Sequence, residues 1–142
     1  RDVRALARRL LETGPYEGIL CIARGGLIPA AILARELDVR LIETICVSSY
    51  DWQEQGTARI LKNARECGKG WLIVDDLVDT GQTARLVRSM FPDARFACVY
   101  AKPAGRFATD IYSVEVSQDT WILFPWDSEM QFVKPIARRL EE

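Results

Sequence analysis

Apolar runs of strand length alternate with amphipathic stretches along this 142-residue chain. Runs without polar alternation are typical of strands covered on both faces, as in parallel sheets. The segments between them carry apolar residues at helical spacing and end near glycine or proline. This pattern predicts helices at 3–11, about 29–37 and 82–90, and strands at 19–23, 41–47, 59–61, 71–74, 96–101 and, at a sheet edge, 111–116.

Strands that alternate with helices in this way predict an α/β fold with a mostly parallel, doubly wound sheet. No internal repeat or linker divides the chain, so a single domain over residues 1–142 is expected. The stretch 48–57 is polar with scattered aromatic residues, which favours a mobile loop or a hairpin arm. The stretch 120–126 is apolar and aromatic but is broken by a proline.

Composition narrows the classes of function. The 19 basic and 20 acidic residues leave a formal charge of -1, which gives no drive toward nucleic acid or anionic membrane. The chain has no histidine, which excludes histidine-based catalysis and ordinary zinc sites. Cys21, Cys46 and Cys98 lie in apolar stretches without C-x-x-C spacing, so we expect small buried residues in a reducing cytosol. No apolar run approaches the ~20 residues that span a membrane.

The run from 71 to 83 carries the clearest chemistry. Four apolar residues are followed by Asp75 and Asp76, then two apolar residues, Asp79, and a small polar turn with one glycine. Carboxylates in this position would lie at the carboxyl end of a strand, where open α/β sheets bind ligands. The turn suits backbone N–H groups that point inward at the start of a helix and bind phosphate. The plain alternative is a βα connection with solvated aspartates.

Every position of the run at 71–83 fits the 5-phosphoribosyl-1-pyrophosphate (PRPP) motif of the type I purine phosphoribosyltransferases, and we interpret it as a resemblance to that family. Residues 22–27 resemble the family's pyrophosphate loop, and 101–106, 119–122 and 125–127 resemble its purine side. Their order and spacing are most similar to the branch that acts on 6-oxopurines. The chain is on these grounds identified as a member of that family.

The resemblance implies a type I phosphoribosyltransferase fold, with a flexible loop and a small hood over the site. It implies a purine salvage enzyme that transfers 5-phosphoribosyl from PRPP to xanthine, guanine or hypoxanthine, releases pyrophosphate and uses Mg²⁺. It also implies a homotetramer or homodimer in the cytoplasm, with no nucleic-acid partner. Peripheral association with the inner membrane stays open. The preference among the three bases is not fixed, because contacts at the purine 2-position would be mainly backbone carbonyls.

The resemblance implies a distinct role for each of the acidic residues. Asp75 and Asp76 would face the ribose hydroxyls and the hydrated metal, with Asp76 nearest Mg²⁺. Asp79 would be the general base that reaches N7 of the purine. Family members that use adenine, orotate or uracil generally carry a non-acidic residue at this place. The alternative for Asp79 is a helix N-cap.

The PRPP contacts implied by the resemblance come from two loops. Arg24 and Gly25 would bind pyrophosphate, one by charge and the other by its backbone. The motif itself would wrap the ribose and the 5′-phosphate, and it supplies the remaining candidates for PRPP binding: Asp75, Asp76, Leu77, Val78, Asp79, Thr80, Gly81, Gln82 and Thr83.

The residues that the resemblance places near the purine come after the predicted strand at 96–101. Lys102 would donate to the purine O6, and its alternative is a solvated lysine at a strand end. Trp121 would stack on the base, and the serious alternative is that it is an aromatic residue of the core. The carbonyls of Trp121 and Ile122 would accept from a 2-amino group. Asp127 is a further candidate that would contact metal-bound water.

The resemblance is incomplete in the flexible loop. Residues 48–51 resemble its beginning, and related enzymes carry a pyrophosphate-binding arginine further along. An ungapped alignment places Gly56 there, with Arg59 three residues on as a further candidate. Two other functions therefore stay under consideration: a PRPP-sensing regulator on the same fold, and a phosphoribosyltransferase for another base such as adenine.

Overall fold

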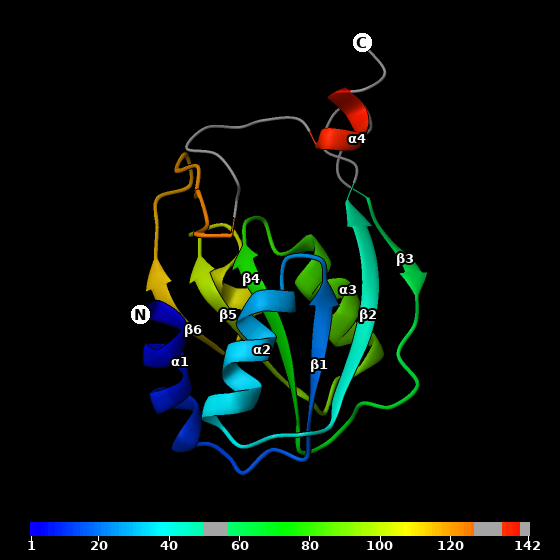
Figure 1. Cartoon of the computed structure of the whole chain (residues 1–142), viewed down its shortest axis with the longest axis vertical. Coiled ribbons are helices and arrows are strands. Elements are labelled where there is room, and N and C mark those ends of the chain that lie inside the picture. Colours follow the sequence, from blue (N-terminus) through cyan, green and yellow to red (C-terminus); the bar gives the residue numbers. More distant parts are fainter. Residues whose placement is uncertain (50–56, 127–134, 140–142) are drawn as a thin grey trace.

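The computed structural model describes residues 1–49, 57–126 and 135–139, and its centre is one six-stranded sheet (Figure 1). All neighbouring strands are parallel except β2 and β3, which pair antiparallel. In spatial order the strands are β3 (Ala58–Lys62), β2 (Ile42–Ser49), β1 (Gly18–Ala23), β4 (Trp71–Val78), β5 (Arg95–Ala101) and β6 (Ile111–Glu115). Strand β6, which was predicted at 111–116 as an edge strand, is indeed at an edge of the sheet.

Helices cover both faces of the sheet, which confirms the doubly wound arrangement. Helices α1 (Asp2–Leu11) and α2 (Leu27–Glu36) pack on one face, and α3 (Gln82–Met90) packs on the other. Two short elements follow, the 3₁₀ helix η1 (Arg106–Ala108) and α4 (Ile136–Arg139). Within the described residues no helix is both long and apolar enough to cross a membrane.

Strand β1 shows why the central strands are apolar throughout. Its residues alternate between two cores: Ile19 and Cys21 belong to the α1–α2 side, whereas Leu20 and Ile22 belong to the α3 side. All four are almost completely buried. Because both faces are covered, neither set of positions can be polar. Cys98 is buried as expected, but Cys46 is only half-buried.

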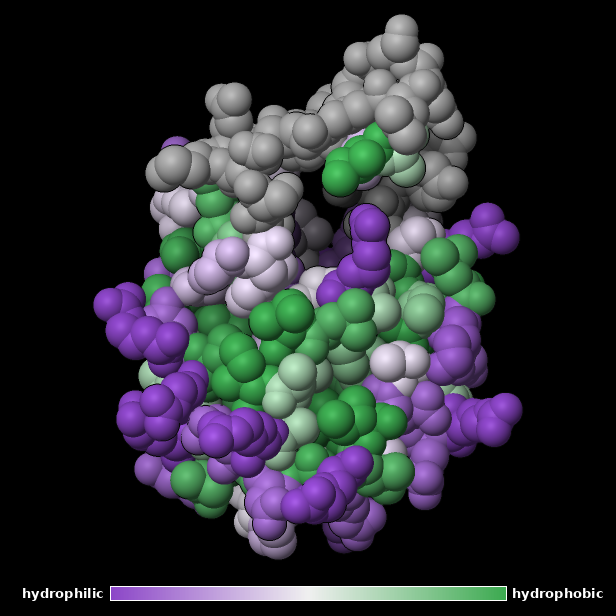
Figure 2. Space-filling model, viewed as in Figure 1, coloured by the Kyte–Doolittle hydropathy of each residue, from purple (hydrophilic) through white to green (hydrophobic). Residues whose placement is uncertain are grey.

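The surface of the α1–α2 face is divided between the two helices (Figure 2). Apolar side chains gather over α2, where Leu27 and Ile28 are exposed, and charged side chains gather over the α1 side. The exposed arginines of α1 include Arg8 and Arg9. The amphipathic pattern at 3–11 therefore predicted the buried side correctly for Val3, Leu6, Ala7 and Leu10, whereas Leu11, the last residue of α1, is 64% exposed.

The largest error in a predicted boundary concerns β4. The apolar run suggested that the central strand ends at Val74, but β4 continues to Val78 and includes both aspartates of the acidic pair. Asp75 lies opposite Cys98 of β5, and Leu77 lies opposite Tyr100. Pairing with β5 continues through Val78, so the sheet overrides the low strand propensity of aspartate.

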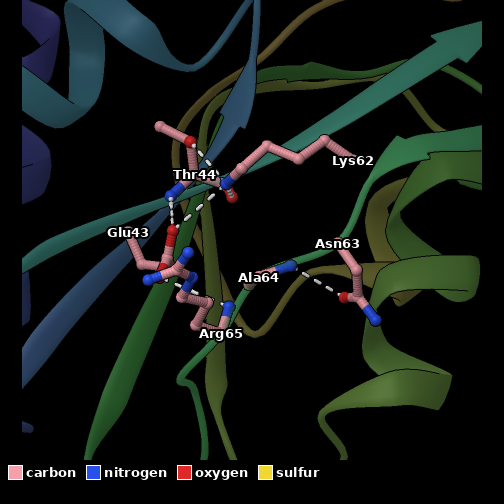
Figure 3. A network of polar contacts seen from close by, with 6 residues as sticks. All are labelled: Glu43, Thr44, Lys62, Asn63, Ala64 and Arg65. Atoms are coloured by element: carbon pink, nitrogen blue, oxygen red, sulfur yellow. Dashed lines mark hydrogen bonds and ion pairs between the residues drawn. The ribbon is translucent and has the colours of Figure 1, made fainter.

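A polar network fastens the antiparallel pair β2–β3 (Figure 3). Glu43 accepts hydrogen bonds from the Thr44 backbone N–H at 2.9 Å, from Lys62 Nζ at 3.3 Å and from the Arg65 backbone N–H at 3.3 Å. Lys62 Nζ also donates to the Thr44 carbonyl at 2.8 Å. These donors lower the pKa of Glu43 below its ordinary value of 4.5, the Thr44 N–H contributing most. Of the stretch 48–57 between the strands, residues 50–56 lie outside the described residues.

Candidate active site

The predicted site residues gather at one edge of the sheet. Strands β1, β4 and β5 are neighbours and run parallel, so the loops that follow them emerge side by side. These loops carry Arg24 and Gly25 after β1, the 79–83 turn after β4, and Lys102 after β5. Sequence segments that are far apart are thus brought together where α/β sheets bind their ligands.

The loop after β1 lies close against β4. Its Ala23–Arg24 peptide bond is cis, and the side chain of Arg24 is exposed. A Cβ atom added to Gly25 would lie 2.5 Å from Asp76 Oδ1. Only glycine lets the backbone approach the carboxylate of Asp76 this closely.

The acidic pair Asp75–Asp76 near the end of β4 is partly buried. Asp75 is buried and its Oδ1 accepts the Asp76 backbone N–H at 2.9 Å, while Asp76 Oδ1 accepts the Leu77 N–H at 2.7 Å. Burial, followed by the negative charge of Asp76, raises the pKa of Asp75 well above its ordinary value of 3.8. A cation or hydroxyl donors supplied at this point would therefore stabilise the ionised carboxylates.

The turn after β4 leads directly into α3. Gly81 is the N-cap residue of this helix and has a left-handed φ of 86°, a conformation that favours glycine. No side chain caps the first turn of α3. The N-cap alternative for Asp79 is therefore wrong, and the first N–H groups of the helix are not covered by a cap. In this turn Thr80 and Gln82 are exposed and Thr83 is half-buried.

Asp79 faces a buried lysine. Lys102 Nζ lies 3.4 Å from Asp79 Oδ2, and the Lys102 side chain is only 8 % exposed, compared with 55 % for Asp79. The alternative of a solvated lysine at a strand end is therefore wrong. A buried ammonium normally has an anionic partner or receives one from a ligand. The arrangement presents a fixed donor and a carboxylate acceptor next to each other.

One further polar residue, Gln118, was not predicted from the sequence. Gln118 Nε2 donates to Asp79 Oδ1 at 2.7 Å, and its Oε1 accepts the Ala104 backbone N–H at 2.9 Å. Gln118 directly precedes the segment 119–122 that resembles the purine side. A single glutamine in a polar stretch carries no spacing signal, so only the fold reveals its contact with Asp79.

The aromatic segment that follows is exposed. Trp121 has 72 % of its surface exposed, so the core-aromatic alternative for this residue is wrong. Ile122 is half-buried. Phe124 stacks on Trp126 with ring centroids 4.8 Å apart, and it also packs on Tyr100 of β5 at 5.9 Å. The segment is thus anchored by Phe124, which leaves the indole of Trp121 accessible.

Of the three remaining candidate positions, only Arg59 belongs to the described residues. Asp127 and Gly56 are outside the described residues. Arg59 is exposed on β3, opposite Ser48 of β2. The structure therefore does not bring Arg59 together with the residues around Asp79 through any described contact.

Comparison with known proteins agrees with this geometry. Residues 1–133 match the family model described as the phosphoribosyl transferase domain. The chain is 64% identical over its full length to a xanthine-guanine phosphoribosyltransferase of Nitratidesulfovibrio vulgaris, covering 88% of that protein. It is 59% identical to the xanthine-guanine phosphoribosyltransferase of Desulfotalea psychrophila, over 98% of this chain and 88% of that protein.

Solved structures give the same result for the fold. A purine phosphoribosyltransferase from Pyrococcus horikoshii superposes with a TM-score of 0.76 at 31% identity, covering 95% of this chain and 92% of that one. A xanthine-guanine-hypoxanthine phosphoribosyltransferase from Helicobacter pylori superposes with a TM-score of 0.68 at 25% identity, covering 89% and 87%. The predicted type I fold is therefore confirmed. The chain belongs to the phosphoribosyltransferase family, and within it to the group of bacterial xanthine-guanine phosphoribosyltransferases.

Proposed function

We propose that this enzyme transfers the 5-phosphoribosyl group of PRPP to a 6-oxopurine, with xanthine, guanine and hypoxanthine as acceptors. The observation that carries the proposal is the pairing of buried Lys102 Nζ with Asp79 Oδ2 at 3.4 Å. O6 and N7 are neighbouring atoms on one edge of an oxopurine. A cationic donor beside a carboxylate therefore suits O6 and a protonated N7 at the same time.

The same pair disfavours adenine. An ammonium group can only donate hydrogen bonds, and the 6-amino group of adenine would present hydrogens to it. Lys102 is buried, so a mismatch would leave its charge without a partner in a poorly hydrated place. The names of the related proteins from N. vulgaris and D. psychrophila, which specify xanthine and guanine, support the choice of an oxopurine.

Asp79 would act as the general base. In the proposed reaction N9 of the base attacks the ribose C1 atom, and the bond between C1 and the pyrophosphate oxygen breaks. The bonding electron pair leaves with pyrophosphate, and the N7 proton passes to Asp79. A well-placed general base of this kind typically contributes a factor of about 10²–10⁴ to the rate.

The phosphate groups of PRPP would be bound mainly by backbone. The left-handed Gly81 and the uncapped start of α3 support binding of the 5′-phosphate by the N–H groups and hydroxyls of residues 79–83, aided by the helix dipole. Arg24 and the backbone of Gly25 would bind the pyrophosphate. Their loop abuts Asp76, which would join the pyrophosphate site to the ribose site.

The acidic pair fits Mg²⁺. Carboxylate oxygens are suitable ligands, and the raised pKa of buried Asp75 indicates a place where a cation would be stabilising. The described part of the chain has no group of three or more metal-binding side chains. That suits Mg²⁺, which commonly keeps several waters and takes phosphate oxygens from the substrate. Asp76 would hold the ion, which would neutralise charge on the leaving pyrophosphate, and Asp75 would accept from the ribose hydroxyls.

The exposed indole of Trp121 would stack on the purine, and the carbonyls of Trp121 and Ile122 would accept from a 2-amino group. The predicted homotetramer or homodimer and the cytoplasmic location stay predictions. Light scattering of the purified chain would measure the assembly.

The test is a product assay. The enzyme is incubated with PRPP, Mg²⁺ and, separately, xanthine, guanine, hypoxanthine or adenine, and nucleoside monophosphate is measured by chromatography. We expect product with the oxopurines, little with adenine, and none when a chelator removes Mg²⁺. Equal rates with adenine would contradict the assignment of Lys102. No product with any base would instead favour a PRPP-sensing regulator.

A further inference from the structure

We propose that Gln118 is a positioning residue that orients the carboxylate of Asp79 for the proton transfer. This inference rests on the proposed function of Asp79 as the base. It assigns a role to a side chain outside the segments that resemble the family's motifs. The role is to hold one carboxylate oxygen so that the other is presented to the purine.

The contacts of Gln118 define its orientation. Nε2 lies 2.7 Å from Asp79 Oδ1 and 3.5 Å from the Asp79 carbonyl oxygen, while Oε1 lies 2.9 Å from the Ala104 backbone nitrogen. The Ala104 N–H can only donate, and an ionised carboxylate can only accept. Reversing the amide would therefore break both contacts, so the NH₂ group faces Asp79.

These contacts give the two oxygens of Asp79 different surroundings. Oδ1 is held by the Gln118 amide at 2.7 Å, and Oδ2 faces Lys102 Nζ at 3.4 Å. Charge-assisted N–H···O bonds are usually about 2.7–2.9 Å long, so the lysine contact is the weaker one. When Lys102 turns to the purine O6, little is lost, and Oδ2 is the oxygen available to accept the N7 proton.

Asp79 needs such a restraint because packing does not supply one. Its side chain is 55 % exposed, which leaves its rotamers open. Its backbone, in contrast, is fixed: Lys102 N–H donates to the neighbouring Val78 carbonyl at 2.9 Å, and a Cβ on Gly105 would lie 2.7 Å from the Asp79 carbonyl oxygen. Gln118 adds the missing restraint on the side chain.

The decisive variant is Gln118→Glu. It keeps the length of the side chain and an oxygen for the Ala104 N–H, but it replaces the donor to Asp79 by a second carboxylate. Gln118→Leu removes both contacts. We expect kcat to fall by about 10-fold or more in each variant, because hydrogen bonds to charged groups are worth on the order of tenfold or more. KM for PRPP should stay within about 2-fold.

A matched control is Glu115→Gln. Glu115 of β6 pairs with Arg106 of η1 at 3.2 Å, so it also ties the chain after β5 to the β6 region. It has no described contact with Asp79. We expect the kcat of this variant to match the wild type, and thermal melts of all variants should show that they fold.

A double-mutant cycle with Asp79→Ala separates positioning from mere structure. If Gln118 acts through Asp79, Gln118→Leu costs nothing further in the Asp79→Ala background. An equal loss in both backgrounds, or an unchanged kcat in Gln118→Glu, would overturn this inference alone. A wild-type enzyme that makes no product, or an Asp79→Ala enzyme with full turnover, would overturn the proposed function and this inference together.

Discussion

Two groups of residues in this molecule differ in how the charge of a carboxylate is compensated: the network of Glu43, Thr44, Lys62 and Arg65, here the Glu43 cluster, and the acidic pair Asp75–Asp76. Glu43 of β2 accepts from three protein donors, on Thr44, Lys62 and Arg65, and those donors lower its pKa. Asp75 at the end of β4 is buried beside Asp76, and burial together with that neighbouring charge raises its pKa. Each cluster lies at the sheet, and each contains a carboxylate that accepts a neighbouring backbone N–H.

The difference separates a structural use of carboxylates from a functional one. The Glu43 cluster is stabilised entirely by its own chain, so its expected contribution is to hold β3 onto the sheet. The acidic pair would be stabilised by a cation, so its expected contribution appears when a ligand binds. The following predictions challenge this distinction, beginning with the largest effect.

Gly25→Ala should abolish activity. The added Cβ would lie 2.5 Å from Asp76 Oδ1, so either the loop after β1 or the carboxylate must move out of place. We expect PRPP binding to be lost in calorimetry and the free energy of unfolding to fall by about 1–3 kcal/mol from overpacking. Gly68→Ala is the control, because a Cβ added there would have nothing within 4 Å, and it should behave as wild type. Retained PRPP affinity in Gly25→Ala would show that the close approach to Asp76 is unimportant.

Asp79→Ala should lower kcat by about 10²–10⁴-fold, the range that a general base supplies. Binding of PRPP should be nearly unchanged, because the phosphates are expected to contact backbone groups of the same turn. Single-turnover kinetics with guanine would measure the chemical step. Unchanged turnover would remove Asp79 from the role of base.

Lys102→Met should weaken discrimination against adenine. Methionine fills a similar volume but cannot donate to O6, so the ratio of kcat/KM for guanine over adenine should fall by about 10–100-fold. Lys69→Met, at an exposed lysine before β4, is the control and should keep the ratio. If Lys102→Met also keeps the ratio, the assignment to O6 is wrong.

Glu43→Gln should affect stability and leave catalysis unchanged. The folded protein lowers the pKa of Glu43, so its stabilisation is present above the ordinary value of 4.5 and is lost as pH falls through the lowered pKa. Urea denaturation should therefore show a less stable variant near pH 7, and the difference in the free energy of unfolding should shrink as the pH falls below 4.5 and through the lowered pKa. If a folded Glu43→Gln enzyme loses turnover at neutral pH, the Glu43 cluster has a functional role and is not merely structural.

The sheet was predicted well from the sequence because each strand and helix carries its own hydrophobic pattern over many residues. Continuous apolar runs and amphipathic stretches located every strand of the sheet and helices α1, α2 and α3 to within about two residues at most ends. The main boundary error was β4, where Asp75 and Asp76 were expected to follow the strand and instead lie in it. Pairing with β5 decided that boundary, and no local pattern reports it.

The candidate site was predicted less completely, since contacts between distant segments leave no local pattern. The resemblance selected Asp79 and Lys102, and the fold brings them within 3.4 Å. It could not show that Lys102 is buried or that Trp121 is exposed. Gln118 was missed, because its significance comes only from where Asp79 and the turn after β5 meet.

The most direct test of the distinction between the two clusters is the affinity for PRPP measured by calorimetry, with Mg²⁺ and with a chelator. We predict tight binding only with Mg²⁺, and Asp76→Asn should bind PRPP as weakly with Mg²⁺ as the wild type does with the chelator. Affinity for PRPP that is the same with and without Mg²⁺, and is unchanged in Asp76→Asn, would contradict a ligand-dependent role for the acidic pair.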